Sequence, residues 1–251
     1  MKGGEPSGTV VLLTDFGPSH YAGILKGVIS GIAPETRLID LTHTVTPHAV
    51  REGAWILLTS YKYFPRGTVF LAVVDPGVGS ERQALALMTK NYYFVGPDNG
   101  LLYPAASEDG ILHVRILQRQ ASCSLTFEGR DLFAPAAARI SRGEALPSLG
   151  VPGRPGVQLG FYLESRTGEV VLIDPFGNLI TNIPPIPGKR AYRLAYAGHA
   201  LTVPYCLTYA EGRAGHLIVT TGSAGTLELA IPNGRASERI ELLPGDRLEL
   251  A

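Results

Sequence analysis

The most constraining feature of this sequence is an apolar run from Thr68 to Val74 that ends at a carboxylate, Asp75. A turn rich in proline and glycine follows and leads to Arg82. A buried strand followed at once by such a turn is typical of an α/β sheet, which binds its ligands at the carboxyl ends of its strands. One aspartate in such a turn is ordinary. The same pattern, however, returns along the chain.

Strands and helices alternate through the first part of the chain. Helical spacing of apolar residues predicts helices over Tyr21 to Ala33, Val50 to Tyr63 and Phe133 to Ser141. The predicted strands between them end at or beside Asp15, Asp40, Asp75 and Asp98. Because parallel strands point the same way, we expect these carboxylates to gather along one rim of the sheet.

The second part of the chain has a different pattern of predicted elements. Residues 142–160 are rich in glycine and proline and read as a linker. Only short strands are predicted beyond it, over residues 170–174, 178–183, 192–196, 216–220, 226–231, 239–242 and 247–250. The sequence therefore predicts an N-terminal α/β domain with a mostly parallel sheet, residues 1–155. A C-terminal antiparallel β-barrel domain, residues 156–251, would follow it.

Composition narrows the class of partner. Lys plus Arg and Asp plus Glu both number 22, so no net charge favours nucleic acid or an anionic membrane, and a small-molecule substrate is expected. Two cysteines, Cys123 and Cys206, are too few for a disulfide framework and indicate a reducing compartment. Residues 1–6 lack the apolar centre of a signal peptide. We expect a cytoplasmic protein with no membrane span.

Familiar cofactor and metal motifs fit poorly. The glycines around Gly77 begin like a dinucleotide fingerprint, but Arg82 replaces the third glycine and no helix pattern follows. His43 and His48 flank Pro47 instead of lying four apart on a helix, so a zinc site is not expected. The rim carboxylates leave open a hard cation such as magnesium as a minor alternative.

Several motifs, in order along nearly the whole chain, together resemble one family. They are Leu13-Thr14-Asp15-Phe16-Gly17, Lys26-Gly27-Val28-Ile29, Val73-Val74-Asp75-Pro76-Gly77-Val78-Gly79, Pro97-Asp98-Asn99-Gly100, Gly129-Arg130-Asp131-Leu132-Phe133-Ala134-Pro135 and Phe176-Gly177-Asn178-Leu179-Ile180-Thr181-Asn182. The set is similar to the S-adenosylmethionine hydroxide adenosyltransferases, relatives of the fluorinase and chlorinase. The resemblance implies an α/β domain, a β-barrel, and a homotrimer with the ligand held between neighbouring subunits.

The implied reaction is displacement by water at the ribose C5′ of S-adenosylmethionine, giving adenosine and L-methionine without metal or cofactor. Asp75 and Arg82 match two members of an Asp-Arg-His set that activates the water. The third position departs from the pattern, because Glu128 stands where the family has histidine. Two close carboxylates tend to share a proton unless Arg82 separates them. We expect a hydrolase that is retuned or slow.

The resemblance also implies substrate contacts. Asp15, within the Asp15-Phe16-Gly17 motif, would hold the ribose hydroxyls, and Asp174 and Asn178 would bind the amino and carboxyl ends of methionine. Weaker matches suggest further substrate contacts at Phe16, His48, Phe176, Ser223 and Asn233. A second departure is the loop Pro18 to His20, which is one residue shorter than the family pattern and carries His20 where aspartate is usual.

Two rival functions remain open at this point. A protein that kept the pocket but lost its base would bind S-adenosylmethionine or adenosine with little or no turnover. A metal-dependent phosphohydrolase would use the rim carboxylates instead. Halogenation is disfavoured, because a carboxylate at position 75 repels a halide.

Overall fold

The computed structural model describes residues 5–251. These residues divide into two compact units, of which the first ends at Leu159 and the second begins at Gly160. Residues 1–4, which hold most of the stretch without a signal-peptide centre, lie outside the described residues. No helix within residues 5–251 is both long and apolar enough to cross a membrane.

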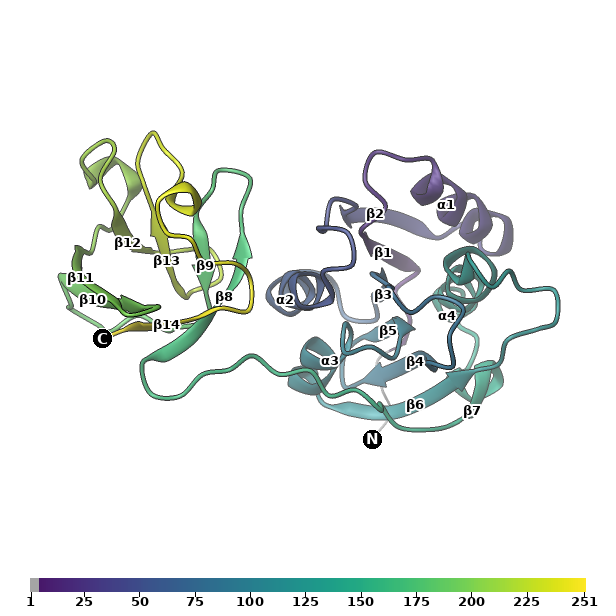
Figure 1. The fold of residues 1–251 in the computed structure, drawn as a ribbon. Helices are drawn as coiled ribbons and strands as arrows, with labels where there is room; N and C mark the ends of the chain where they lie inside the picture. The colour runs from purple at the N-terminus through teal and green to yellow at the C-terminus, as the bar shows by residue number, and fades with distance from the viewer. Residues whose placement is uncertain (1–4) are drawn as a thin grey trace. The chain divides into compact units, whose positions relative to one another are not determined.

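The first unit is built on a mixed sheet whose described residues form seven strands in the order β2-β1-β3-β5-β4-β6-β7 (Figure 1). These are β1 (Thr9–Thr14), β2 (Arg37–Thr42), β3 (Val69–Val73), β4 (Ala84–Thr89), β5 (Tyr93–Pro97), β6 (Ile111–Leu117) and β7 (Gly150–Pro152). Strand β1 runs parallel to β2 and β3, and β3 runs parallel to β5. Strand β4 is antiparallel to β5 and β6. The parallel strands bring the ends of β1 and β3 to one edge.

Helices cover both faces of this sheet. The helices are α1 (Tyr21–Ile32), α2 (Val50–Ser60), α3 (Tyr103–Asp109) and α4 (Ala134–Ser141), with 3₁₀ turns η1 (Tyr61–Tyr63) and η3 (Leu146–Leu149) and a π-helical turn η2 (Gly129–Phe133). Figure 1 shows α1 and α4 on one face and α2 and α3 on the other. Leu25 and Ile29 of α1 join Leu12 and Leu71 of the sheet in a fully buried core. Burial of these apolar side chains stabilises the scaffold on which the strand ends sit.

The second unit is an antiparallel sheet that nearly closes on itself. Within the described residues its seven strands lie in the order β11-β10-β14-β8-β9-β13-β12. They are β8 (Thr167–Ile173), β9 (Leu179–Thr181), β10 (Ala191–Tyr196), β11 (His199–Pro204), β12 (Ile218–Thr221), β13 (Leu227–Ala230) and β14 (Arg247–Leu250), with 3₁₀ turns η4 (Tyr209–Glu211) and η5 (Ala236–Glu238). Tyr205, just after β11, forms a bridge to Val219 of β12, the opposite edge. The barrel-like expectation is confirmed.

Helix α3 was not expected, and three further details differ from the sequence expectation. The segment 239–242, expected as a strand, is irregular in the structure, and its buried Ile240 and Leu242 fill the core from a loop. Strand β11 was not expected, and it pairs with β10 through a turn at Ala197 and Gly198, both with positive φ. The expected linker also contributes β7, which pairs with β6. Alternation of apolar residues reports burial, and only pairing partners decide whether a strand forms.

Candidate active site

The turn after β3 places Asp75 and Arg82 at the edge of the first sheet. The amide of Gly77 donates to Asp75 Oδ1 at 3.3 Å, and the amide of Ser80 donates to the carbonyl of Gly77 at 3.1 Å. Gly79 has a φ of +79°, and a Cβ there would lie 2.5 Å from the carbonyl oxygen of Leu125. A glycine is therefore required where the turn meets the loop around Leu125.

Asp75 and Arg82 form a buried, two-pronged ion pair. Arg82 Nε lies 2.9 Å from Oδ1 and 3.1 Å from Oδ2 of Asp75, and Nη2 also donates to Oδ2. The Arg82 and Asp75 side chains are only 10% and 5% exposed. The guanidinium also lies over the ring of Phe133, 5.3 Å from its centroid. Such fork-like pairing fixes geometry as well as charge.

Glu128 joins this pair from another part of the chain. It directly precedes η2, its side chain is 1% exposed, and Arg82 Nη2 donates to its Oε2. Arg82 therefore bonds to both carboxylates and lies between them. A π-helical turn of this kind is frequent at functional sites.

A second arginine, Arg119, completes the group. Its Nε forms an ion pair with Glu128 Oε1, and its Nη2 donates to the carbonyl of Ser80 at 2.8 Å. We call Asp75, Arg82, Glu128 and Arg119 the charge network. Sequence reasoning missed Arg119, which lies in a segment without a motif. The signal available was the extra negative charge that Glu128 brings, which called for another cation nearby.

A cavity of about 190 Å³ opens beside the charge network. Its lining includes Asp15, His48, Asp75 and Glu128, together with Phe16. Asp15 Oδ2 accepts a hydrogen bond from the backbone amide of His48 at 2.9 Å, and His48 has a φ of +68°. The structure thus brings together the predicted residues of the first unit around one small space.

Aromatic rings gather near this cavity. Phe16, Tyr21 and Phe127 contact one another edge to face, with centroids 5.2 to 6.1 Å apart. His20, from the shortened loop, lies against Tyr21 with centroids 4.5 Å apart. Edge-to-face packing of this kind holds the rings in a defined arrangement.

Two carboxylates of the expected rim, Asp40 and Asp98, are not among the residues that line this cavity. Asp40 pairs with Lys26 at 2.6 Å and with His43 at 3.0 Å. Burial would raise the pKa of Asp40, but the hydrogen bonds from Lys26 and His43 outweigh it and leave that pKa lowered. Asp98 accepts the backbone amides of residues 156 and 157 at 2.9 to 3.2 Å. Each carboxylate is committed to another contact.

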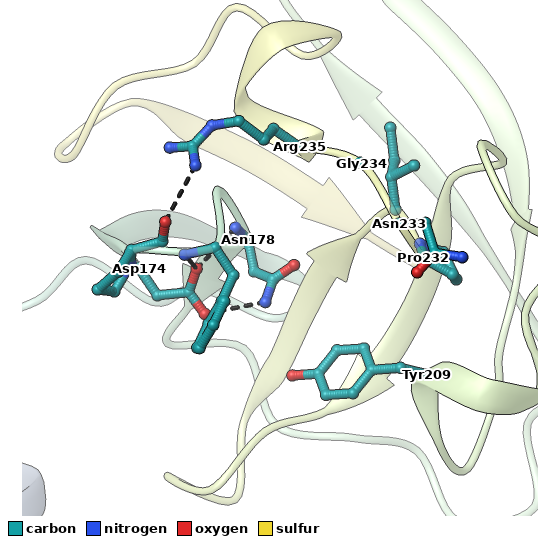
Figure 2. Close-up of a pocket in the computed structure, with 10 residues that line it drawn as sticks. Asp174, Asn178, Tyr209, Pro232, Asn233, Gly234 and Arg235 are labelled. Carbon is teal, nitrogen blue, oxygen red and sulfur yellow. Dashed lines mark hydrogen bonds between the residues drawn. The ribbon is translucent and has the colours of Figure 1, made fainter.

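The second unit has its own pocket, of about 620 Å³, shown in Figure 2. Asp174 and Asn178 form one wall, where the Asn178 side-chain amide donates to Asp174 Oδ2 at 2.9 Å. Two backbone amides of the same turn donate to Asp174 Oδ1, so this loop is fixed by local bonds. Tyr209 faces them from the opposite side, and Arg235 caps the loop by donating to the carbonyl of Pro175 at 3.0 Å.

Of the weaker sequence matches in the second unit, Phe176 and Asn233 line this pocket, and Ser223 does not. Asn233 lines the pocket and has a φ of +57°. Phe176 also lines it, with 75% of its surface exposed. Ser223 lies in the turn between β12 and β13, outside the residues that line the pocket. Tyr209 and Arg235 are lining residues that sequence reasoning did not select.

A buried glutamate stands behind Tyr209. Glu228 of β13 is 3% exposed and accepts a hydrogen bond from the Tyr209 hydroxyl. Burial is the main cause that raises the pKa of Glu228, and the charge of Asp174 adds to it. Burial and the same hydrogen bond also raise the pKa of Tyr209. Tyr209 is thus a neutral donor at ordinary pH.

The minor metal alternative finds no ligand cluster in the described part of the chain. Within residues 5–251, no group of three or more His, Cys, Asp or Glu side chains is arranged to hold a metal ion.

The comparisons with known proteins cover both units. Residues 10–150 match the model of the SAM hydroxide adenosyltransferase N-terminal domain, and residues 168–249 match that of its C-terminal domain. An (R)-S-adenosyl-L-methionine hydrolase from Salinispora arenicola is 37% identical, over 94% of this chain and 95% of that protein. A fluorinase from Actinoplanes sp. is 28% identical, over 82% of this chain and 84% of that enzyme.

Solved structures agree with this relationship. The crystal structure of an uncharacterized conserved protein from Thermotoga maritima superposes with a TM-score of 0.89 at 36% identity, covering 96% of this chain and 100% of that one. Both domain models match in order along the chain, and the relatives are of similar length, so one family accounts for both units. The chain belongs to the SAM hydroxide adenosyltransferase family.

Proposed function

We propose that this protein hydrolyses S-adenosylmethionine at the ribose C5′ to adenosine and L-methionine. The observation that carries the proposal is the buried Asp75–Arg82 pair, whose carboxylate lines a cavity together with Asp15. The relatives named (R)-S-adenosyl-L-methionine hydrolase, 36% to 39% identical, support the same substrate.

The chemistry asks little of the leaving group. The water oxygen bonds to C5′ as the C5′–S bond breaks, and the bonding electrons stay on sulfur. The sulfonium thereby leaves as the neutral thioether of methionine, so no general acid is needed. What limits the rate is the poor nucleophile, which must be held in line and lose one proton.

The charge network meets these needs without a cofactor. Asp75 accepts a hydrogen bond from the water and then its proton, while Arg82 stabilises the hydroxide character that develops. Asp15 accepts hydrogen bonds from the ribose hydroxyls, which a carboxylate does with both oxygens. The carboxylate of Asp75 lines the cavity and disfavours a halide as the nucleophile, which favours hydrolysis over halogenation.

We propose a homotrimer in which one subunit supplies the first unit's cavity and a neighbour supplies the second unit's pocket. The methionine end of the substrate would contact Asp174 and Asn178. Both cysteines are free, which fits the cytoplasmic location that the sequence predicts.

The direct test incubates the purified protein with S-adenosylmethionine and follows adenosine and methionine by chromatography, with and without a chelator. Equal amounts of both products, unaffected by the chelator, are expected. Loss of product with the chelator would show that the hydrolysis depends on a metal ion and would refute this mechanism.

One observation favours the rival, a binding protein with little turnover. Both buried carboxylates already accept hydrogen bonds from arginine, which leaves fewer of their lone pairs free to accept a hydrogen bond from a water. Calorimetry with S-adenosylmethionine and with adenosine separates the two functions, because tight binding without product would support the binding protein.

The shared site has its own test. Asp75→Asn and Asn178→Ala variants damage different halves, so co-expressing them should restore about a quarter of wild-type activity if neighbouring chains form each site. No restoration, with the trimer intact by light scattering, would refute the shared arrangement.

A further inference from the structure

The charge network holds one more carboxylate than the family's Asp-Arg-His set. With a neutral histidine, that set has no net charge, because Asp75 balances Arg82. Glu128 instead adds a negative charge at a position only 1% exposed. A buried carboxylate without a balancing cation is strongly unfavourable. The chain must therefore compensate for Glu128.

Arg119 has the contacts of the compensating group. Its Nε pairs with Glu128 Oε1, whereas Arg82 bonds to the other oxygen, Oε2. Its Nη2 donates to the carbonyls of Ser80, at 2.8 Å, and of Arg82, at 3.5 Å. One guanidinium thus holds both Glu128 and the backbone of the turn that carries Arg82.

We propose that Arg119 is a positioning residue that neutralises Glu128 and so leaves Arg82 committed to Asp75. This proposal rests on the proposed hydrolysis. Without Arg119, Arg82 is the remaining cation beside two carboxylates, and Glu128 draws it away from Asp75. The water-activating pair then loses its geometry. Arg119 is not among the residues that line the cavity, so substrate binding should change little.

The proposal predicts that the effect of Arg119 reverses with the residue at position 128. In the wild-type background, Arg119→Gln should lower kcat by about 10- to 100-fold and change KM by less than about threefold. In a Glu128→His background the arginine is a surplus positive charge. There, Arg119→Gln should raise kcat or leave it unchanged.

The same four proteins give a readout that does not depend on turnover. Arg119→Gln should lower the melting temperature in the wild-type background, because it strands the Glu128 carboxylate. In the Glu128→His background, where no carboxylate remains to be stranded, its effect on the melting temperature should be much smaller. This double-mutant cycle isolates the coupling between the two positions.

Two further variants separate positioning from simple packing. Arg119→Lys keeps the charge but not the fork, so it should recover part of the lost kcat. Arg193→Gln removes a surface arginine that pairs with Glu249 at 3.6 Å in the other unit, and it should leave kcat unchanged.

Equal losses of kcat on Arg119→Gln in both backgrounds would overturn the proposal, as would a loss confined to KM. A wild type that releases no adenosine would refute the proposed function and with it the catalytic part of this inference. The melting cycle would then still decide whether Arg119 neutralises Glu128.

Discussion

Each unit of this protein buries a glutamate next to its pocket, and the two are stabilised in different ways. Glu128 is paired with Arg82 and Arg119, whereas Glu228 accepts a hydrogen bond from the neutral hydroxyl of Tyr209. A carboxylate that is paired with cations can interact electrostatically with a charge that develops during a reaction. Compensation by a neutral donor leaves burial dominant, and the pKa of Glu228 is accordingly raised. The first arrangement suits chemistry and the second suits binding.

The largest effect should come from the first unit's charge network. Asp75→Asn keeps the shape but removes the carboxylate that accepts the proton, so kcat should fall by about 10²- to 10⁴-fold. Adenosine release measures kcat, and calorimetry should show S-adenosylmethionine still bound. An unchanged rate would contradict the mechanism. Asn233→Ala, in the second unit, should instead act mainly on KM.

A second effect distinguishes the two glutamates by stability. Glu128→Gln removes the anion between Arg82 and Arg119 and leaves two like charges close together. Because Arg119 is 29% exposed, solvent screens part of the repulsion, and we expect a loss of about 2–4 kcal/mol in the free energy of unfolding. Urea denaturation measures it. A neutral or stabilising result would show that Glu128 is not held by its charge.

The smallest effect concerns Glu228 and has the opposite sign. A carboxyl whose folded pKa is raised above its ordinary 4.5 favours folding at low pH, and this contribution is lost as the pH rises through the folded pKa. Glu228→Gln should therefore stabilise the protein slightly at pH 7 and less at pH 4. Melting temperatures across this range test the prediction.

Glu144 supplies a matched control for that pH dependence. A hydrogen bond from Arg139 is the main cause that lowers the pKa of Glu144 to about 2. Its stabilising contribution is present above pH 4.5 and is lost as the pH falls toward 2. Glu144→Gln should therefore destabilise at pH 7 and less so at pH 3. The same trend in both variants would contradict the assignment for Glu228.

The sequence predicted much of the fold because the relevant signals are local. Apolar periodicity located α1, α2 and α4, and the Pro/Gly turn after β3 placed Asp75 at a strand end. Strand β11 was not predicted, because the turn at Ala197 and Gly198 carries no strong sequence signal, although both residues adopt a positive φ. Strand order could not show that Asp40 and Asp98 have other partners, because side-chain contacts cannot be read from it.

By itself, the sequence determined the alternation of strands and helices, the change to short strands, and the proximity of Asp75 to Arg82. These follow from patterns within a few residues. Tertiary structure alone decided that Arg119 meets Glu128 and that Tyr209 meets Glu228 across 19 positions. The physical reason is that a buried charge must find a partner in space, and folding chooses that partner from segments with no local relation to it.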